Sequence, residues 1–341
     1  MCLPSLFAQR VGQGQTPSQA PLGRSALGSF AEQCSVKKHS YWRPMTKQTS
    51  RVASTFMGNA PLVIGVLLVV DSLHFIFARL LAPHLPGGTS AMYVLAVATL
   101  EVTVFLAIKG NIRPRLFLQN ASFFLIIGLL VAAATSLNYI AVGYIDPGTA
   151  AMLAQSATIF ALAFSVFWLR ERLSSVQILG AILALVGVFI ISFQPGDYLR
   201  LGSLMVLASA FMYALHAAIV KRHGGEMEFS NFFLWRVAST TAFLLLFTTV
   251  RGQWVWPDRE AWIIIIAAGT VDVVISRVLY YVALRRLKMS IHTIILTISP
   301  VLTVLWSLLL FSERPSVQAL VGGAAVIAGV VIVTSSFGRS R

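Results

Sequence analysis

From residue 60 to residue 336 the chain alternates between long apolar runs and short polar breaks. A helix needs about 20 predominantly apolar residues to cross the hydrocarbon core of a bilayer. Ten runs reach or approach this length: 60–81, 89–109, 121–142, 147–169, 176–193, 201–220, 231–250, 261–284, 291–311 and 317–336. The short alternating strands of a membrane β-barrel are absent from the sequence. The pattern therefore predicts an all-α integral membrane protein with ten transmembrane helices.

The breaks between the runs carry turn signals, such as Pro-His-Leu-Pro-Gly-Gly at 83–88 and Gln-Pro-Gly-Asp at 194–197. Asp146 followed by Pro147 is typical of a helix start, with Asp as the N-cap and Pro in the first helical position. Pro300 lies inside the ninth run and should kink it, because proline removes a backbone hydrogen bond.

Composition narrows the class of protein. Hydrophobic residues make up 57% of the 341 residues and charged residues only 11%, whereas soluble domains are about 25% charged. An ordinary soluble enzyme and a disordered chain are therefore excluded. The sequence has no Gly-rich phosphate loop, no His-Glu-x-x-His and no Gly-x-Ser-x-Gly, and Cys2 and Cys34 belong to no zinc-like spacing. We expect a protein that is not an enzyme and that holds no cofactor or metal.

Residues 1–56 differ from the rest of the chain. They hold seven Lys and Arg against the single acid Glu32, are rich in Ser, Gln, Gly and Pro, and lack a long apolar run. This composition predicts a disordered basic tail. It is also typical of an organelle transit peptide, and a start at Met45 is an alternative that would remove most of the tail.

The basic residues orient the helices. With the N-terminus inside, the inner segments carry nineteen Lys and Arg and the outer segments five, while Arg236 and Arg277 lie within runs. Cytoplasmic loops of membrane proteins carry such an excess. We therefore expect both termini to be cytoplasmic, in a plasma (inner) membrane. The net charge of +14 then reflects topology, and no nucleic-acid partner is expected.

The sequence repeats itself at an offset of 142 residues, where 139–190 aligns with 281–332 without a gap. The matched pairs in this segment are Tyr139 with Tyr281, Ala141 with Ala283, Glu171-Arg172 with Glu313-Arg314, Ser174 with Ser316, Gly180 with Gly322 and Gly187 with Gly329. The same offset also places His74 on His216. We expect two five-helix units, 57–194 and 199–337. Because five is odd, the second unit is inserted upside down, and inverted repeats are typical of secondary transporters.

At these residues the sequence resembles the EamA-domain proteins of the drug/metabolite transporter superfamily. The resemblance is carried by Asn138-Tyr139-Ile140-Ala141, Leu-Arg-Glu-Arg-Leu-Ser at 169–174, Gln177, Gly180 and Gly187-Val188, and in the second copy by Ser299-Pro300-Val301, Phe-Ser-Glu-Arg-Pro-Ser at 311–316 and Gly329-Val330. It implies ten helices, with the first four of each repeat around a central cavity, and export of amino acids or other metabolites. The family often has an Arg early in the second helix of each repeat. Arg236 fits this in the second copy, but Val94 stands there in the first.

Polar groups inside the runs are the candidates for function, because they are costly in lipid and face a cavity or a partner. The candidate substrate-binding or coupling residues are Asp71, His74, Glu101, Tyr139, Tyr213, His216, Arg236, Asp272, Arg277 and Tyr281. A carboxylate that takes up a proton loses its charge, so Asp71, Glu101 or Asp272 can couple transport to a proton gradient. His74 lies one helical turn from Asp71 and can relay the proton.

The arginines leave two interpretations open. Arg236 and Arg277 can hold a substrate carboxylate or phosphate through paired donors, or they can pair with Asp272 or Glu101 and lock helices together. Five residues separate Asp272 from Arg277, so on an α-helix they point in different directions and have different partners. Glu171 and Glu313 lie at helix junctions and are expected to cap helices or pair locally.

The sequence thus predicts a secondary transporter that moves a small amino-acid-like or other polar solute across the bilayer by alternating access, as proton-linked efflux. Small residues four apart, Gly180 with Ala184 and Ala325 with Gly329, suit close helix packing and a homodimer contact. The alternatives are a membrane enzyme acting on lipid headgroups, which would cluster acids and histidines at one interface, and a subunit that transports nothing.

Overall fold

The structure is a computed structural model, and it describes residues 60–168, 174–194, 198–199, 201–223, 227–280, 296 and 298–336. Tyr281 and the tail 1–56 lie outside these residues. The elements of the first repeat are α3 (Ala60–Asp71), α4 (His74–Leu81), α5 (Gly87–Ile108), α6 (Pro114–Gln119), α7 (Ala121–Ala141), α8 (Pro147–Ala154), α9 (Ala157–Phe167) and α10 (Ser175–Ser192). Two-residue strands β1 (Phe193–Gln194) and β2 (Tyr198–Leu199) pair antiparallel after it.

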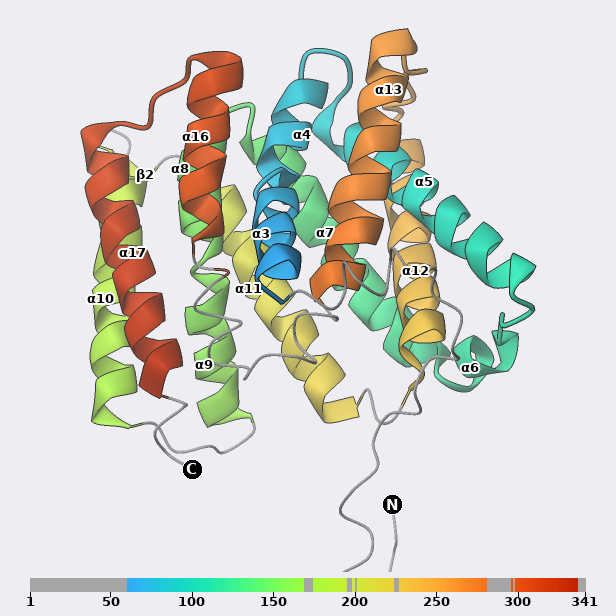
Figure 1. The fold of residues 1–341 in the computed structure, drawn as a ribbon, viewed down its shortest axis with the longest axis horizontal. Coiled ribbons are helices and arrows are strands. Elements are labelled where there is room, and N and C mark those ends of the chain that lie inside the picture. The colour runs from blue at the N-terminus through green and yellow to red at the C-terminus, as the bar shows by residue number, and fades with distance from the viewer. Residues whose placement is uncertain are drawn as a thin grey trace, which may run out of the picture. The chain divides into compact units, whose positions relative to one another are not determined.

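The second repeat continues with further helices (Figure 1). These are α11 (Leu201–His223), α12 (Phe229–Val250), α13 (Arg259–Ala268), the π-helix η1 (Gly269–Ile275), α16 (Ser299–Phe311) and α17 (Val317–Ser336). Among the described residues, seven segments are long and apolar enough to cross a membrane, and Ser175–Ile191, Ser299–Phe311 and Val317–Val333 are shorter apolar helices. Many large apolar side chains are exposed on the outside of the helices. Such side chains are suited to contact with lipid tails, which are equally apolar.

The two repeats match in helix length. α5 and α12 each have 22 residues, and their first residues, Gly87 and Phe229, are 142 apart. Thr99 of α5 and Thr241 of α12 are also 142 apart, and their hydroxyls hydrogen-bond to each other at 2.8 Å. Two equivalent residues touch each other directly only near a two-fold axis. This pair therefore marks a pseudo-two-fold axis between the repeats.

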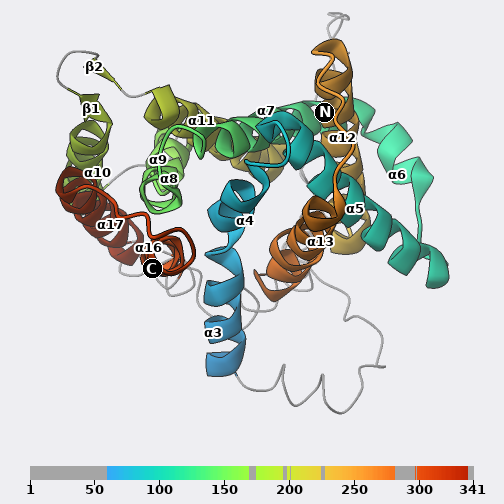
Figure 2. The ribbon, with the colours of Figure 1, turned by 90° about the horizontal axis from the view of Figure 1, so that it is seen from above.

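The fifth helices of the repeats, α10 and α17, lie side by side in Figures 1 and 2. A Cβ on Gly180 would lie 2.8 Å from the carbonyl oxygen of Gly329, and a Cβ on Gly187 would lie 2.5 Å from that of Gly322. The two contacts are equivalent, because Gly322 and Gly329 are the offset positions of Gly180 and Gly187. The earlier glycine of α10 meets the later glycine of α17, so the two helices run antiparallel. The glycines predicted for a dimer contact thus pack two helices of one chain.

A second reciprocal pair ties the ends of α5 and α12. Thr89 donates a hydrogen bond to the Gln253 carbonyl at 2.8 Å, and its equivalent Asn231 donates one to the Asn111 carbonyl at 2.9 Å. Each helix start is therefore held by the backbone that follows the other helix. Such reciprocity is what a two-fold relation between the units requires.

The predicted fourth helix begins as expected but does not continue as one piece. Asp146 accepts a hydrogen bond from the Thr149 N–H at 2.8 Å, and Pro147 opens α8. The helix is interrupted at Gln155 and Ser156, between α8 and α9. In the second repeat Pro300 stands in the first turn of α16, after a turn at Ile298. Most of the ninth run before Ile298 lies outside the described residues, so the kink predicted at Pro300 stays a prediction.

Candidate functional site

The first predicted helix, 60–81, is broken between α3 and α4. Asp71 ends α3 and His74 begins α4, with Ser72 and Leu73 between them. The second repeat holds the break in place. Thr303 of α16 donates a hydrogen bond to the Ser72 carbonyl at 2.9 Å, and the Trp306 indole donates one to the Ser72 hydroxyl at 3.1 Å. A backbone group freed inside a bilayer must find such a partner.

The break sets His74 against Asp272. His74 Nδ1 lies 2.8 Å from Asp272 Oδ2, and the Asp272 side chain is only 8% exposed. Asp272 belongs to η1, where the helix widens to hydrogen bonds between residues five apart. Such π-turns are frequent at functional sites. The sequence named both residues as candidates but offered no local sign that they meet, since 198 positions separate them.

Arg277 completes the charged cluster. It interacts electrostatically with Asp71 and Asp272, and Asp71 also accepts a hydrogen bond from the buried Ser299 hydroxyl. Asp272 and Arg277 were expected to have different partners. Asp272 contacts His74, whereas the strongest electrostatic interaction of Arg277 is with Asp71, and its interaction with Asp272 comes second. Asp71, His74, Asp272 and Arg277 are called the charged cluster below.

Tyr139 closes one side of the charged cluster. Its ring meets the His74 ring edge to face, with centroids 5.9 Å apart, and it is 2% exposed. Its hydroxyl is buried and has no hydrogen-bond partner among the described residues. The neighbouring Asn138 Oδ1 is in the same state. A buried polar group without a partner costs about 1–3 kcal/mol, which makes these two groups candidates for contact with a solute.

The positions related to the charged cluster by the 142-residue offset form a different cluster. Tyr213 stands at the offset position of Asp71, and Thr135 stands at that of Arg277. Their hydroxyls are 2.8 Å apart. His216 is the counterpart of His74, but the counterpart of Asp272 is Leu130. His216 Nε2 is buried without a partner in the described part of the chain. Tyr213, Thr135 and His216 are called the neutral cluster below.

The remaining candidates lie on α5 and α12. Glu101 accepts a hydrogen bond from the Thr270 hydroxyl at 2.5 Å, which places it against the start of η1. The guanidinium of Arg236 lies over the Phe233 ring, 5.4 Å from its centroid, and interacts electrostatically with His216 and Tyr213. No ion pair between Glu101 and an arginine occurs among the described residues.

At one end of the helices a further ion pair joins the repeats. Arg79 of α4 donates through Nε to Glu313 Oε1 at 3.1 Å and through Nη1 to the Val142 carbonyl at 2.8 Å. Its Nη2 also contacts Glu313. The expectation that Glu313 caps or pairs locally was wrong, because its partner lies 234 positions away. On the predicted topology this pair is at the outer face.

Several residues of the site carried no signal in the sequence. Ser72, Thr270 and Thr303 are ordinary members of apolar runs, whereas Thr99 with Thr241, and Thr135, could have been found from the 142-residue offset. Within the described ranges, no three His, Cys, Asp or Glu side chains are grouped so that they could hold a metal ion. The site's chemistry is that of carboxylates, imidazoles, a guanidinium and hydroxyls within the membrane-spanning segments.

Two homologous helical units, a broken first helix and a cluster of ionisable groups between the units are features of membrane transporters. The model of the EamA-like transporter family matches residues 62–193 and 200–335. The chain belongs to this family, and the part of it that the structure describes contains seven segments long and apolar enough to cross a membrane.

Similar proteins are named as transporters, and those whose names give a solute name different ones. "Uncharacterized transporter YdfC" of Bacillus subtilis is 26% identical over 54% of this chain. The "Riboflavin transporter" of Vibrio cholerae is also 26% identical over 54% of the chain. In both cases the matched part spans 62% of the relative's length. The "Probable terminal-alkyne amino-acid exporter" of Streptantibioticus cattleyicolor is 27% identical over 58% of this chain and 68% of its own.

A solved crystal structure has the same fold. Its TM-score is 0.59 at 18% sequence identity, and the match covers 81% of this chain and 98% of that one.

Proposed function

We propose that this protein is a secondary transporter that moves a small organic solute by alternating access and exchanges it for protons. In this proposal ten helices cross the plasma membrane as two inverted five-helix units, with both termini in the cytoplasm. The observation that carries the proposal is the break after Asp71, which brings His74 to 2.8 Å from Asp272. Broken helices with ionisable groups at the repeat interface are the usual place for a transporter's coupling site.

The charged cluster suits a coupling proton. When Asp272 or Asp71 takes up a proton, its charge disappears and its attraction to Arg277 weakens. His74 bridges α4 and η1, so its hydrogen bond to Asp272 links the two repeats. A proton at this pair therefore changes the contact that holds the halves together. Alternating access needs such a change in the energy of one conformation relative to the other.

The neutral cluster suits the solute. His216 has no carboxylate at the position that serves His74, whereas Arg236 and Arg277 both act on it electrostatically. A carboxylate on the solute would supply the missing acid, and the hydroxyl of Tyr139 and the carbonyl of Asn138 would bind its other polar groups. The amino-acid exporter and the riboflavin transporter among the relatives support a polar organic solute, and efflux is the direction we propose.

The test is uptake into proteoliposomes with an imposed pH gradient, using a set of radiolabelled amino acids and other metabolites. We expect the wild type to accumulate one of them in response to the gradient. Asp272→Asn and His74→Gln should abolish this accumulation while still allowing exchange of labelled for unlabelled solute, because exchange needs no net proton movement. Full gradient-driven accumulation by Asp272→Asn would contradict the proposal.

A matched control comes from the same two segments. His84 Nδ1 lies 3.0 Å from Asp258 Oδ2, so a second His–Asp pair also joins the first helix region to the start of α13. This pair is in the exposed loops. His84→Gln should keep accumulation intact. If it were as damaging as His74→Gln, the effect would reflect loss of a contact between segments rather than loss of coupling.

A further inference from the structure

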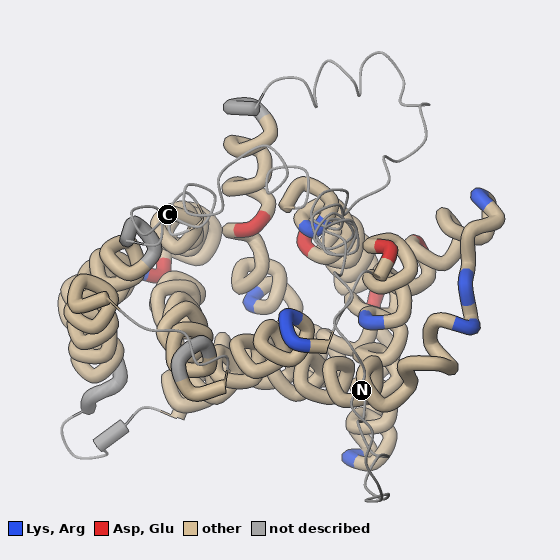
Figure 3. The backbone as a smooth tube through the Cα atoms, turned by 90° about the horizontal axis from the view of Figure 1, so that it is seen from below, with Lys and Arg blue, Asp and Glu red and all other residues tan. Residues whose placement is uncertain are grey.

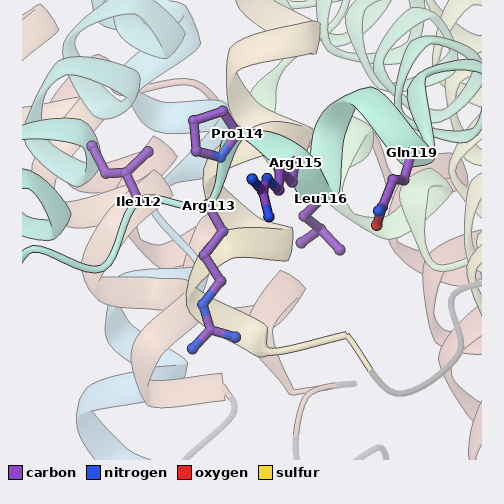
Figure 4. Close-up of a pocket in the computed structure, with 6 residues that line it drawn as sticks. All are labelled: Ile112, Arg113, Pro114, Arg115, Leu116 and Gln119. Atoms are coloured by element: carbon purple, nitrogen blue, oxygen red, sulfur yellow. The ribbon is translucent and has the colours of Figure 1, made fainter.

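The connection between α5 and α7 contains a hollow lined by basic and apolar side chains. The cavity has a volume of about 430 Å³ and is lined by Ile112, Arg113, Pro114, Arg115, Leu116 and Gln119. In Figure 4 Arg115, Leu116 and Gln119 extend from the same side of α6, and the Arg113 guanidinium reaches out beneath them. Seen from below in Figure 3, this basic connection lies at the margin of the helices.

The backbone of this hollow is held firmly, while Arg113 forms an ion pair with Glu228 and Arg115 is exposed. The Arg113 N–H donates to Asn231 Oδ1 at 2.9 Å, and the Trp235 indole donates to the Arg113 carbonyl at 3.2 Å. The Arg113 side chain is 63% exposed and lies 3.3 Å from one oxygen of Glu228. Arg115 is exposed, and no ion pair is recorded for it among the described residues.

The hollow opens beside a lipid-facing surface. It follows the end of α5, where the apolar side chains of Phe105 and Ile108 are 55% and 82% exposed. Ring contacts of Phe117 with Phe124 and Trp235 hold α6 against the helices. The two guanidinium groups match the phosphate of a phospholipid. The exposed apolar side chains at the end of α5 match its acyl chains. Arginine binds phosphate oxygens through two parallel hydrogen bonds.

The repeat provides an internal comparison. The equivalent connection of the second unit, after α12, has Val255 and Pro257 where the first has Arg113 and Arg115, and its neighbours are Trp254 and Trp256. Both connections follow helices of equal length, so the fold does not require the arginines. On the predicted topology only the basic connection faces the cytoplasm, where anionic lipids and basic residues attract each other.

We propose that the hollow at α6 is a binding site for the phosphate group of an anionic phospholipid in the cytoplasmic leaflet. The acyl chains lie along the exposed face of α5, and Arg113 and Arg115 bind the phosphate. The site is separate from the charged and neutral clusters.

The test is native mass spectrometry of the full-length protein in detergent with equal amounts of phosphatidylglycerol and phosphatidylcholine of the same acyl chains. We expect the wild type to retain phosphatidylglycerol preferentially. Each arginine near a membrane surface contributes roughly fivefold to the affinity for anionic lipid. Arg115→Gln should therefore lower the preference about fivefold and the double change Arg113→Gln with Arg115→Gln about 25-fold.

Three controls keep the result clear. Arg251→Gln, at an exposed arginine after α12, should leave the preference unchanged, and Arg115→Lys should retain most of it. The melting temperature of each variant in phosphatidylcholine reports whether it is folded. If the double variant is not folded, the result for Arg115→Gln alone decides the test.

Equal retention of both lipids by the wild type, or an unchanged preference in Arg115→Gln, overturns the proposal. Displacement of the lipid by excess inorganic phosphate also overturns it, in favour of a soluble anion.

Discussion

The charged and neutral clusters occupy positions related by the 142-residue offset, each takes side chains from both repeats, and the two clusters have opposite chemistry. In the first, a broken helix supplies Asp71 and His74 to Asp272 and Arg277. In the second, α11 runs unbroken from Leu201 to His223, and Tyr213 meets Thr135 through a neutral hydrogen bond. Two sets of positions related by the pseudo-symmetry thus hold different side chains.

The difference shows what the pseudo-symmetry does and does not impose. It imposes the close helix contacts, since Gly180 with Gly329 and Gly187 with Gly322 are copies of each other. It does not impose the ionisable groups, because Asp272 and Arg277 have Leu130 and Thr135 as their counterparts. Charges within a membrane are costly, and a fold that holds neutral groups in one of the two clusters has no structural need of charges in the other. This supports different tasks for the two clusters.

The strongest test replaces a charged residue by its neutral counterpart. Arg277→Thr copies Thr135 into the first cluster and leaves Asp71 and Asp272 without their cation. Removing one partner of buried charges costs about 3–5 kcal/mol. We therefore expect a large fall in melting temperature and a loss of pH-driven accumulation of more than about tenfold, since a barrier higher by 1.4 kcal/mol already slows a step tenfold.

Arg277→Lys is the control for this change. It keeps the charge and should recover part of the stability and transport, although lysine lacks the planar fork of arginine. If Arg277→Thr were as stable and active as the wild type, the two clusters would be interchangeable and the proposed division of tasks would be wrong.

The sequence predicted the helices well and their interruptions poorly. α5, α7, α11 and α12 begin and end within three residues of the apolar runs, because run length and polar breaks are enough to define a spanning helix. The break at Ser72–Leu73 has no Pro or Gly to mark it. It depends on Thr303 and Trp306, which come from the other repeat.

The site was predicted as a set of candidates rather than as an arrangement. Burial of an ionisable group in an apolar run is visible in the sequence, so Asp71, His74, Asp272 and Arg277 could be named. Their contacts were not visible, because the π-turn at Gly269–Ile275 leaves no mark in the periodicity. The 142-residue offset did hold the missing information for the neutral cluster, since it places Tyr213 and Thr135 where Asp71 and Arg277 stand.

A second test makes the outer end of the first helix resemble its counterpart. Arg79→Lys introduces the residue found at the offset position, Lys221. Arg79 donates at once to Glu313 and to the Val142 carbonyl, which a lysine cannot do with the same geometry. Loss of part of a charge-assisted network costs about 1–2 kcal/mol. We expect a lower melting temperature in detergent, and an unchanged one would show that this linkage adds nothing to stability.

A third test addresses the neutral cluster. Tyr213→Phe removes the hydroxyl that hydrogen-bonds to Thr135 and should cost about 1 kcal/mol of stability. If the solute binds beside this pair, KM should rise several-fold while accumulation still follows the pH gradient. Loss of the pH response with an unchanged KM would instead place coupling in the neutral cluster. Steady-state uptake at several external pH values distinguishes these outcomes.

The smallest effect should come from the exposed His–Asp pair. Asp258 caps α13 by accepting from the Ala261 N–H at 2.7 Å, and it also accepts from His84. These bonds, the backbone one first, lower the pKa of Asp258 below its usual value of 3.8. The contribution of Asp258 to stability is therefore complete above that usual value and is lost as pH falls through the lowered pKa of the folded protein.

His84→Gln should leave the melting temperature at neutral pH unchanged within measurement, because exposed ion pairs contribute little. Asp258→Asn should flatten the fall in melting temperature at the most acidic pH values that the detergent complex tolerates. His74→Gln, in contrast, should change the pH dependence of transport itself. If His84→Gln reduced transport as much as His74→Gln, the position of a His–Asp pair in the membrane would not determine its effect on transport. The distinction between the charged cluster and the exposed pair would then be wrong.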